Sequence, residues 1–166
     1  MDILKQNSTC KFKKDNNIHT EEISVEGAPM DLLLLADPSE DAINKYIRDC
    51  KILVAKLKSK VIGVIAFVEK SSNTYEIMNL AVDEGYRGRG IGKKLIYSAE
   101  DKIKKLGGEK ILIGTGNSSI DQLLFYQKVG FRMVEIHKDF FVDNYIEEIY
   151  ENGIRCMDMV RLEKRI

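Results

Sequence analysis

The stretch Arg87-Gly88-Arg89-Gly90-Ile91-Gly92-Lys93 is the most informative part of this sequence. It lies between a predicted strand, Thr74 to Val82, and a predicted amphipathic helix whose apolar residues recur at helical spacing. Glycines let the backbone turn tightly and approach a ligand closely, and the first turn of a helix leaves N–H groups without partners. Those N–H groups and the helix dipole favour an anion, so the stretch predicts a phosphate-binding turn.

The charged residues around this turn also favour an anion. Eight cations and three acids lie between Tyr86 and Lys110, which gives a local balance of +5. Over the whole chain, 26 basic residues balance 26 acidic ones and the net charge is zero. The sequence therefore lacks the overall basic excess of a nucleic-acid-binding protein, and we expect no nucleic-acid partner.

The spacing of the glycines excludes two common phosphate sites. A Walker loop needs Gly, four residues and then Gly-Lys-Ser/Thr, but here Arg87 stands at the first position and Lys94 at the last. A dinucleotide fingerprint needs G-x-G-x-x-G, and its third glycine would fall on Lys93 or Leu95, depending on where the motif starts. The chain is therefore neither a P-loop NTPase nor a Rossmann domain.

The hydrophobic patterns around the turn predict antiparallel strands followed by alternating strands and helices. In the first half we expect a buried strand over 31–36, a helix over 42–47 capped by Asp37 or Ser39, a hairpin of 52–57 and 61–68, and the strand 74–82. The helix that follows has Ile91, Leu95, Ala99, Ile103 and Leu106 on one face and is ended by Gly107-Gly108. After it we expect a strand over 110–113, a loop over 114–118, a helix from Ser119 through Lys128 with Ser119 and Gln122 as a capping box, and strands over 132–137 and 156–162. This order predicts an α/β or α+β domain with a mixed sheet.

Length and composition indicate one ordinary globular domain. The 166 residues, 44% of them apolar, are enough to bury a core without disulfide or metal. We expect a low-order arm over residues 1–30, with one short strand around Glu22 to Val25, and a single domain over residues 31–166. No C-x-x-C pair, secretory signal or apolar run of membrane-spanning length is present. We therefore expect a cytoplasmic protein without a membrane partner.

Three motifs, in order, connect the turn to a known family. Arg87, Gly90 and Gly92 match the signature Arg/Gln-x-x-Gly-x-Gly/Ala, the strand Glu76-Ile77-Met78-Asn79-Leu80-Ala81-Val82 precedes it, and Tyr126-Gln127-Lys128-Val129-Gly130-Phe131 is similar to Tyr-x-x-x-Gly-Phe. Together they resemble the GNAT superfamily of N-acetyltransferases, and the chain looks like one of its small bacterial members. The resemblance implies a mostly antiparallel sheet flanked by helices, with a splayed cleft for acyl-CoA. It also implies an enzyme that moves an acetyl group from acetyl-CoA to a primary amine.

The resemblance also implies which residues contact the cosubstrate, acetyl-CoA. Backbone amides from Arg89 to Lys93 would hold the pyrophosphate, and Leu80 to Val82 would pair with the pantetheine arm, with an amide near Val82 polarising the thioester carbonyl. The family often has Asn seven residues before the tyrosine, where this chain has Ser119. Asn117 either takes over that contact with pantetheine or only shapes the loop. The implied acetyl-CoA-binding residues are Leu80, Ala81, Val82, Arg87, Gly88, Arg89, Gly90, Ile91, Gly92, Lys93, Asn117 and Ser119.

Acetyl transfer to an amine needs an acid and a base, because the ammonium must lose a proton and the leaving CoA thiolate receives one. The resemblance places the acid at Tyr126, whose alternative role is to pack against the sheet. Strand alternation would put Glu76, Met78, Leu80 and Val82 on one face, which makes Glu76 the candidate base. Glu76 would otherwise act through a water relay or be a solvated strand end. Metal-ligand spacing is absent, so we expect no metal.

An acidic segment is the only sequence feature that bears on the acceptor. Residues 139–152 hold five acids and no Lys or Arg: Asp139, Asp143, Glu147, Glu148 and Glu151. In the family the loop before the last strand borders the acceptor site, which favours a cationic amine such as a polyamine, an aminoglycoside or a peptide amine. The alternative function is a catalytically silent acyl-CoA-binding regulatory module. The resemblance also implies a homodimer.

Overall fold

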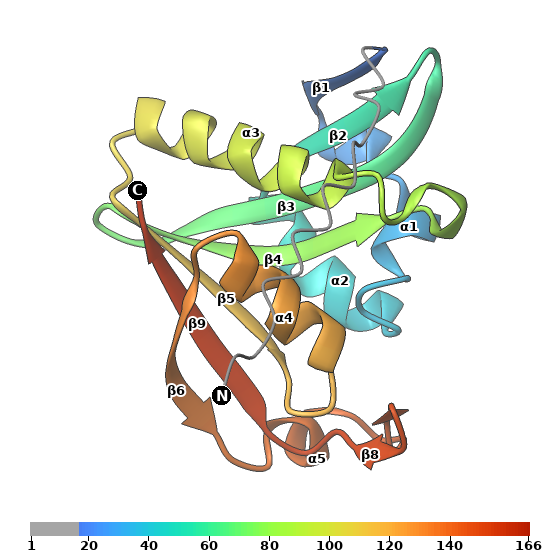
Figure 1. Cartoon of the computed structure of the whole chain (residues 1–166), viewed down its shortest axis with the longest axis vertical. Coiled ribbons are helices and arrows are strands. Elements are labelled where there is room, and N and C mark those ends of the chain that lie inside the picture. Colours follow the sequence, from blue (N-terminus) through green and yellow to red (C-terminus); the bar gives the residue numbers. More distant parts are fainter. Residues whose placement is uncertain (1–16) are drawn as a thin grey trace, which may run out of the picture.

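One seven-stranded sheet organises the chain, of which the computed structural model describes residues 17–166 (Figure 1). Its strands lie in the order β1 (Ile18–Ile23), β2 (Lys51–Leu57), β3 (Lys60–Ser71), β4 (Thr74–Val82), β5 (Lys110–Gly116), β9 (Met159–Arg165) and β6 (Arg132–His137). Every neighbouring pair is antiparallel except β4 and β5, which are parallel. The predicted mixed, mostly antiparallel sheet is therefore confirmed.

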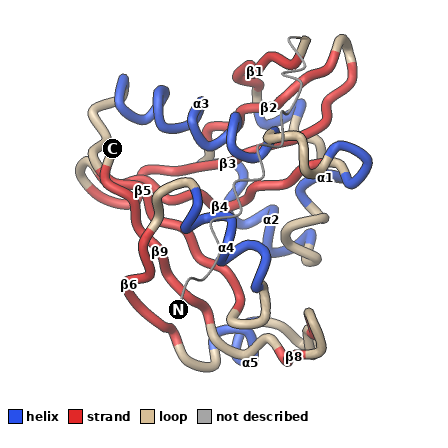
Figure 2. The backbone as a smooth tube through the Cα atoms, viewed as in Figure 1, coloured by secondary structure: helices blue, strands red, loops and turns tan. Residues whose placement is uncertain are grey.

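Helices cover both faces of this sheet. They are α1 (Met30–Leu33), α2 (Glu40–Tyr46), α3 (Ile91–Lys105), α4 (Ile120–Lys128) and α5 (Phe140–Asn144), with short 3-10 turns η1 (Val25–Gly27), η2 (Ile47–Asp49) and η3 (Glu84–Tyr86). A separate hairpin consists of β7 (Tyr150–Glu151) and β8 (Ile154–Arg155). Figure 2 shows α3 running along β3 and β4. One core cluster lies under α3 and α4, and a second lies under α1 and α2 on the opposite face.

The parallel pair β4 and β5 separates halfway along β4. Thr74 to Ile77 pair with Lys110 to Ile113, and no pairing continues beyond them within residues 17–166. β5 continues to pair with β9 as far as Gly116, so it leaves β4 together with β9 and β6. We call this feature the β4–β5 divergence (Figure 1). It leaves one edge of the last residues of β4 open.

A β-bulge in β4 breaks the alternation of its side chains. Ile77 is paired with Phe67 and Asn79 with Ala66, which leaves Met78 as an extra residue on β4. Ile77 and Leu80 consequently face the core under α3, while Met78 contacts the core under α1 and α2. A bulge shifts the two-residue period by one, so polar and apolar positions change faces in the middle of this strand.

Two predictions about the N-terminal part were wrong. The apolar run over 31–36, predicted as a strand, forms α1 and the turn after it, because a short continuous apolar run does not distinguish strand from helix. Residues 18–30, predicted as part of a low-order arm, contain β1, which pairs with β2 along its whole length. β1 is polar because it is an edge strand, and Glu21 lies 2.5 Å from Lys56 of its neighbour. The predicted strand around 22–25 therefore begins earlier, at Ile18, and residues 1–16 of the predicted arm lie outside the described residues.

Most of the later predicted elements agree with the structure. The hairpin of β2 and β3, the strand β4 and the burial of Ile91, Leu95, Ala99 and Ile103 are as predicted. Leu106 differs, since it follows α3 and is 43% exposed. β5 extends into the predicted loop as far as Gly116, and the last strand begins at Met159 because Cys156 belongs to the connection after β8.

The close packing of α3 on β4 gives a stability prediction at Gly108. A Cβ atom at Gly108 would overlap the side chain of Ile103 and lie 2.8 Å from the ring of Tyr75. Overpacking of this kind costs about 1–3 kcal/mol, so we expect Gly108→Ala to lower the melting temperature by about 2–12 °C. Gly27→Ala is the matched control, because its Cβ would meet no described atom within 4 Å. Equal melting temperatures for the two variants would contradict this packing.

Candidate active site

The glycine-rich turn leads from the open end of β4 into α3. Gly88 and Gly90 adopt positive φ angles of 75° and 78°, and Gly90 is the N-cap residue of α3. The N–H of Lys94 donates to the carbonyl of Gly90 at 3.0 Å, which is the first hydrogen bond of the helix. The N–H groups of the helical residues before Lys94 therefore have no partner within the helix. A Cβ at Gly90 would meet no atom of residues 17–166 within 4 Å, which leaves the space in front of this helix end open.

The two arginines of the turn are exposed, and each donates a hydrogen bond to the backbone. Arg87 Nε donates to the carbonyl of Val82 at 3.2 Å, and an Arg89 guanidinium nitrogen donates to the carbonyl of Gly85 at 3.3 Å. The Arg89 guanidinium also lies 5.2 Å from the centre of the Tyr86 ring. Both side chains thus hold the turn in shape while their positive charges stay beside the helix N-terminus. The predicted role of Arg87 and Arg89 as cosubstrate contacts remains a prediction.

The open edge of β4 lies next to this turn. The N–H of Asp83 donates to the carbonyl of Ile62 on β3 at 3.0 Å. Successive N–H groups of a strand point to opposite edges, so the N–H groups of Val82 and Leu80 point away from β3, into the β4–β5 divergence. The N–H of Ala81 points toward β3 by the same alternation. An extended ligand can therefore pair with Leu80 and Val82 as a further strand.

Tyr126 lies in α4, which packs directly against the start of α3. A Cβ at Gly92 would lie 3.2 Å from the Phe125 ring, so this glycine allows the two helices to meet. The Tyr126 ring packs at 5.4 Å from Phe125 and 6.0 Å from Phe131, measured between ring centres. Tyr126 is 7% exposed, and burial raises the pKa of its hydroxyl above the usual value of 10. No hydrogen-bond partner of this hydroxyl is found among residues 17–166, and the role of Tyr126 as the acid remains a prediction.

Glu76 is buried and already paired with two cations. Its carboxylate forms ion pairs with Arg161 and, at 3.3 Å, with Lys70. The prediction that Glu76 shares a face with Leu80 and Val82 was wrong, because the bulge at Met78 intervenes. Glu76 instead lies on the α1 and α2 side, at the point where pairing between β4 and β5 ends.

The loop before α4 uses its polar side chains within the protein. Asn117 Oδ1 accepts from the N–H groups of Met157 at 2.8 Å and Asp158 at 3.0 Å, and its Nδ2 donates to the carbonyl of Arg155 at 3.1 Å. Of the two alternatives for Asn117, these contacts support the shaping of the loop. Ser119 precedes α4 without capping it, because its hydroxyl is bonded to Glu151. The predicted capping box was therefore wrong.

The geometry above gives a glycine-rich turn at a helix N-terminus, an open strand edge and a buried tyrosine near the end of β4. A family model described as the acetyltransferase (GNAT) family matches residues 21–131. This chain belongs to the GNAT family.

Individual GNAT proteins support this assignment. The uncharacterized N-acetyltransferase YvbK of Bacillus subtilis strain 168 is 49% identical over 132 residues, covering 80% of this chain and 85% of that protein. A GNAT acetyltransferase from Elizabethkingia anophelis with acetyl-CoA bound has a TM-score of 0.87 and 42% identity, covering 91% of this chain and 99% of the other. A Bacillus subtilis acetyltransferase in complex with CoA has a TM-score of 0.81 and 46% identity, covering 90% and 98%. The predicted family, fold and enzyme class, an acetyl-CoA-dependent N-acetyltransferase, are confirmed.

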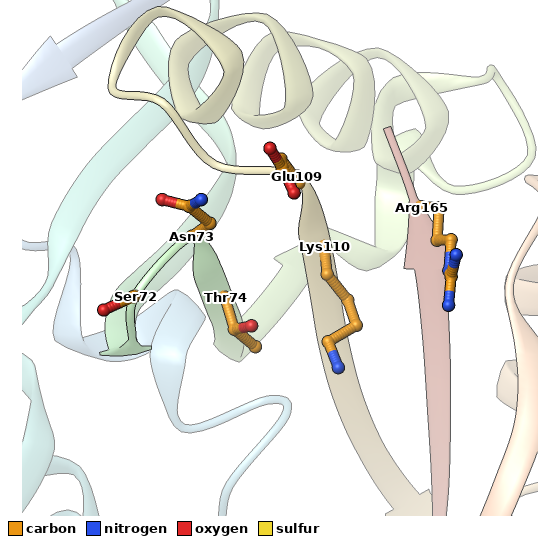
Figure 3. Close-up of a pocket in the computed structure, with 6 residues that line it drawn as sticks. All are labelled: Ser72, Asn73, Thr74, Glu109, Lys110 and Arg165. Atoms are coloured by element: carbon orange, nitrogen blue, oxygen red, sulfur yellow. The ribbon is translucent and has the colours of Figure 1, made fainter.

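In residues 17–166 no His, Cys, Asp and Glu side chains gather in a group that could hold a metal ion. Among the same residues no helix is long and apolar enough to cross a bilayer. A hollow with a volume of about 320 Å³ lies at the start of β4 and β5, at the opposite end of β4 from the glycine-rich turn. Figure 3 shows its lining, Ser72, Asn73, Thr74, Glu109, Lys110 and Arg165.

A group of polar side chains near the bulge of this GNAT domain was not predicted from the sequence. Asn79 on β4 is 4% exposed and donates to the hydroxyl of Tyr46 at 3.0 Å. Asp37 accepts from the hydroxyl of Tyr145 at 3.4 Å. A signal was present, since Asn79 interrupts an otherwise apolar run from Ile77 to Val82. We call these four residues the bulge cluster.

Proposed function

We propose that this GNAT enzyme transfers the acetyl group of acetyl-CoA to a primary amine by direct attack in a ternary complex. The observation that carries the proposal is the position of the open edge of β4 immediately before the N-terminus of α3. The N–H groups of Leu80 and Val82 would pair with the pantetheine arm, and those from Arg89 to Lys93 would bind the pyrophosphate. The acetyl-CoA and CoA complexes of the two similar proteins support this arrangement.

The proposed reaction moves two protons. The neutral amine nitrogen attacks the thioester carbonyl carbon, the new C–N bond forms, and the C–S bond breaks to release the CoA thiolate. The Tyr126 hydroxyl donates its proton to that sulfur, and the proton lost from the amine returns to solvent or to tyrosinate. An N–H on the open edge of β4 would stabilise the oxyanion, a contribution of about 2.7–4 kcal/mol where one such donor has been removed from other enzymes.

The experiment that tests the proposal measures cosubstrate binding and turnover separately. Acetyl-CoA at about 100 times its dissociation constant should stabilise the protein by about 2.7 kcal/mol and raise the melting temperature by about 5–10 °C. Thiol release from acetyl-CoA in the presence of primary amines then reports transfer. No rise in the melting temperature would contradict the proposal. A rise without thiol release for any amine would favour the silent regulatory module.

Glu76 is better placed to brace the sheet than to take a proton. We propose that its ion pair with Arg161 of β9 ties β4 to the strands beyond β5, next to the β4–β5 divergence. Breaking a buried ion pair costs about 3–5 kcal/mol, so Glu76→Gln and Arg161→Gln should each lower the melting temperature. Both substitutions remove the same ion pair. The melting temperature of the double variant should therefore fall by less than the sum of the two single falls. A fall in kcat for Glu76→Gln alone, at unchanged melting temperature, would instead restore Glu76 as the base.

In our proposal only some residues of the acidic segment attract a cationic acceptor. Glu148 lies 2.8 Å from Arg155, and Glu151 binds the hydroxyl of Ser119, so both have partners in the fold. Asp139, Asp143 and Glu147 form no ion pair among the described residues. A cationic amine therefore remains our proposed acceptor class. The homodimer stays a prediction, and the surface that supports it is β6, which has no second strand partner among residues 17–166 and exposes Met133, Val134 and Ile136.

A further inference from the structure

The bulge cluster brings together side chains from four separate segments on the α1 and α2 side of the sheet. Asp37 precedes the N-cap of α2, Tyr46 ends α2, Asn79 follows the bulge in β4, and Tyr145 follows α5. α5 is bound to the connection before β9, through the N–H of Phe141 and the carbonyl of Met157 at 2.9 Å. The contact between Asp37 and Tyr145 therefore joins the elements on the two sides of the β4–β5 divergence.

The amide of Asn79 has an oxygen that the protein does not use. Its Nδ2 donates to the carbonyl of Leu33 and to the hydroxyl of Tyr46, both at 3.0 Å. A backbone carbonyl only accepts hydrogen bonds, so the nitrogen must face Leu33, which fixes the orientation of the amide. Asn79 Oδ1 is buried and has no hydrogen-bond partner among residues 17–166. Such an oxygen is uncommon in folded proteins, and it requires a donor.

Asp37 carries a carboxylate whose charge is not balanced within the described chain. Its Oδ1 accepts from the N–H of Ser39 at 3.1 Å and from the Tyr145 hydroxyl at 3.4 Å. No Lys, Arg or His among residues 17–166 lies within ion-pair distance of Asp37. Its second oxygen, Oδ2, has no hydrogen-bond donor in that part of the chain. The half-buried carboxylate thus lacks a cation.

The electrostatics of the cluster favour neutral tyrosines beside this carboxylate. Burial, with the nearby Asp37 charge as a further cause, raises the pKa of both Tyr46 and Tyr145 to about 12. Both hydroxyls therefore stay protonated at neutral pH and are available as hydrogen-bonding groups. Burial also raises the pKa of Asp37 from its usual value, as expected for a carboxylate without a cationic partner.

We propose that the bulge cluster binds the acceptor amine, and that it selects amines that carry a second positive charge. The reacting amino group donates to Asn79 Oδ1, next to Leu80 on the open edge of β4, and the second cationic group binds Asp37. A bound ammonium supplies the donor that Oδ1 lacks and the cation that Asp37 lacks. The inference rests on the proposed acetyl transfer and names its acceptor class. Holding α1 and α2 on β4 would need only the Asn79 Nδ2 contacts and would leave the buried Oδ1 without a donor.

A charge series of amines with one four-carbon chain tests the inference. The substrates are 1,4-diaminobutane, n-butylamine and 4-aminobutanoate, which end in a cation, a methyl group and an anion. We expect kcat/KM to fall in that order, with about a tenfold advantage of the diamine over butylamine. Asp37→Asn should remove this advantage, because asparagine keeps an oxygen for Ser39 and Tyr145 but loses the charge. Tyr46→Phe should raise KM for all three amines and leave the acetyl-CoA-induced rise in melting temperature unchanged.

Asp41→Asn is the matched control, since Asp41 is an exposed carboxylate in the first turn of α2. It should keep the full preference for the diamine. The same preference in Asp37→Asn as in the unmodified enzyme would overturn the inference. Absence of turnover with all three amines, in a protein that acetyl-CoA stabilises, would overturn the inference while leaving the donor site in place. Absence of stabilisation by acetyl-CoA would overturn the proposed function and, with it, this inference.

Discussion

Tyr126→Phe is expected to lower kcat by about 10²–10⁴-fold and to leave the stabilisation by acetyl-CoA unchanged. The substitution removes only the hydroxyl that would protonate the departing thiolate. The ring keeps its packing against Phe125 and Phe131, so the fold and the cosubstrate site should persist. Because burial raises the pKa of this hydroxyl above 10, its protonated form persists at high pH. Loss of that proton should therefore produce no fall in kcat below about pH 10.

Steady-state thiol release with a saturating amine measures this effect. Tyr75→Phe is the matched control, because Tyr75 is a second buried tyrosine of the same core cluster, at the other end of β4 from the glycine-rich turn. It should keep the kcat of the unmodified enzyme. An unchanged kcat in Tyr126→Phe would remove Tyr126 from the mechanism and leave it a packing residue.

Gly90→Val is expected to abolish the rise in melting temperature caused by acetyl-CoA, a loss of about 2.7 kcal/mol of ligand stabilisation. Gly90 has a φ of 78° and open space in front of its Cα, where the side chain of valine would project. In our proposal that space takes the pyrophosphate. Valine would also strain the backbone, since a left-handed conformation costs a residue with a side chain about 1–2 kcal/mol.

Gly107→Val separates these two effects. Gly107 also has a positive φ, of 87°, and open space for a Cβ, but it lies at the opposite end of α3. Both variants should melt at a lower temperature than the unmodified protein, and only Gly107→Val should keep the full response to acetyl-CoA. Thermal unfolding with and without acetyl-CoA measures both. A full response in Gly90→Val would show that the glycine-rich turn does not contact the cosubstrate.

The parts of the fold that sequence predicted well are those with a clear period or a strong end signal. The apolar spacing from Ile91 to Ile103 and the glycine at position 107 defined α3, and the turn residues around Asn73 separated β3 from β4. The strand β1 was predicted too late in the chain, around 22–25, because its polar side chains form ion pairs with the neighbouring strand and its sequence shows little of the alternation of a half-buried strand.

The candidate site was predictable only as far as local motifs extend. The glycine-rich turn and Tyr126 belong to such motifs. The error at Glu76 came from one extra residue, Met78, whose effect on side-chain direction depends on how β4 pairs with β3. Asp37 and Tyr145 are 108 residues apart in the chain, and they meet only because the fold brings the residue after α5 next to the residues before α2. Contacts of this kind have no local signature.

The bulge at Met78 also affects how substrate range can change in this enzyme. A regular strand gives each face every second residue, whereas here Glu76, Met78, Asn79 and Ala81 all lie on the α1 and α2 side. Leu80 and Val82 keep the opposite side and the open edge. If our proposals hold, substitutions that change the choice of amine can therefore accumulate at several positions of one strand while the neighbouring residues go on binding the acetyl donor.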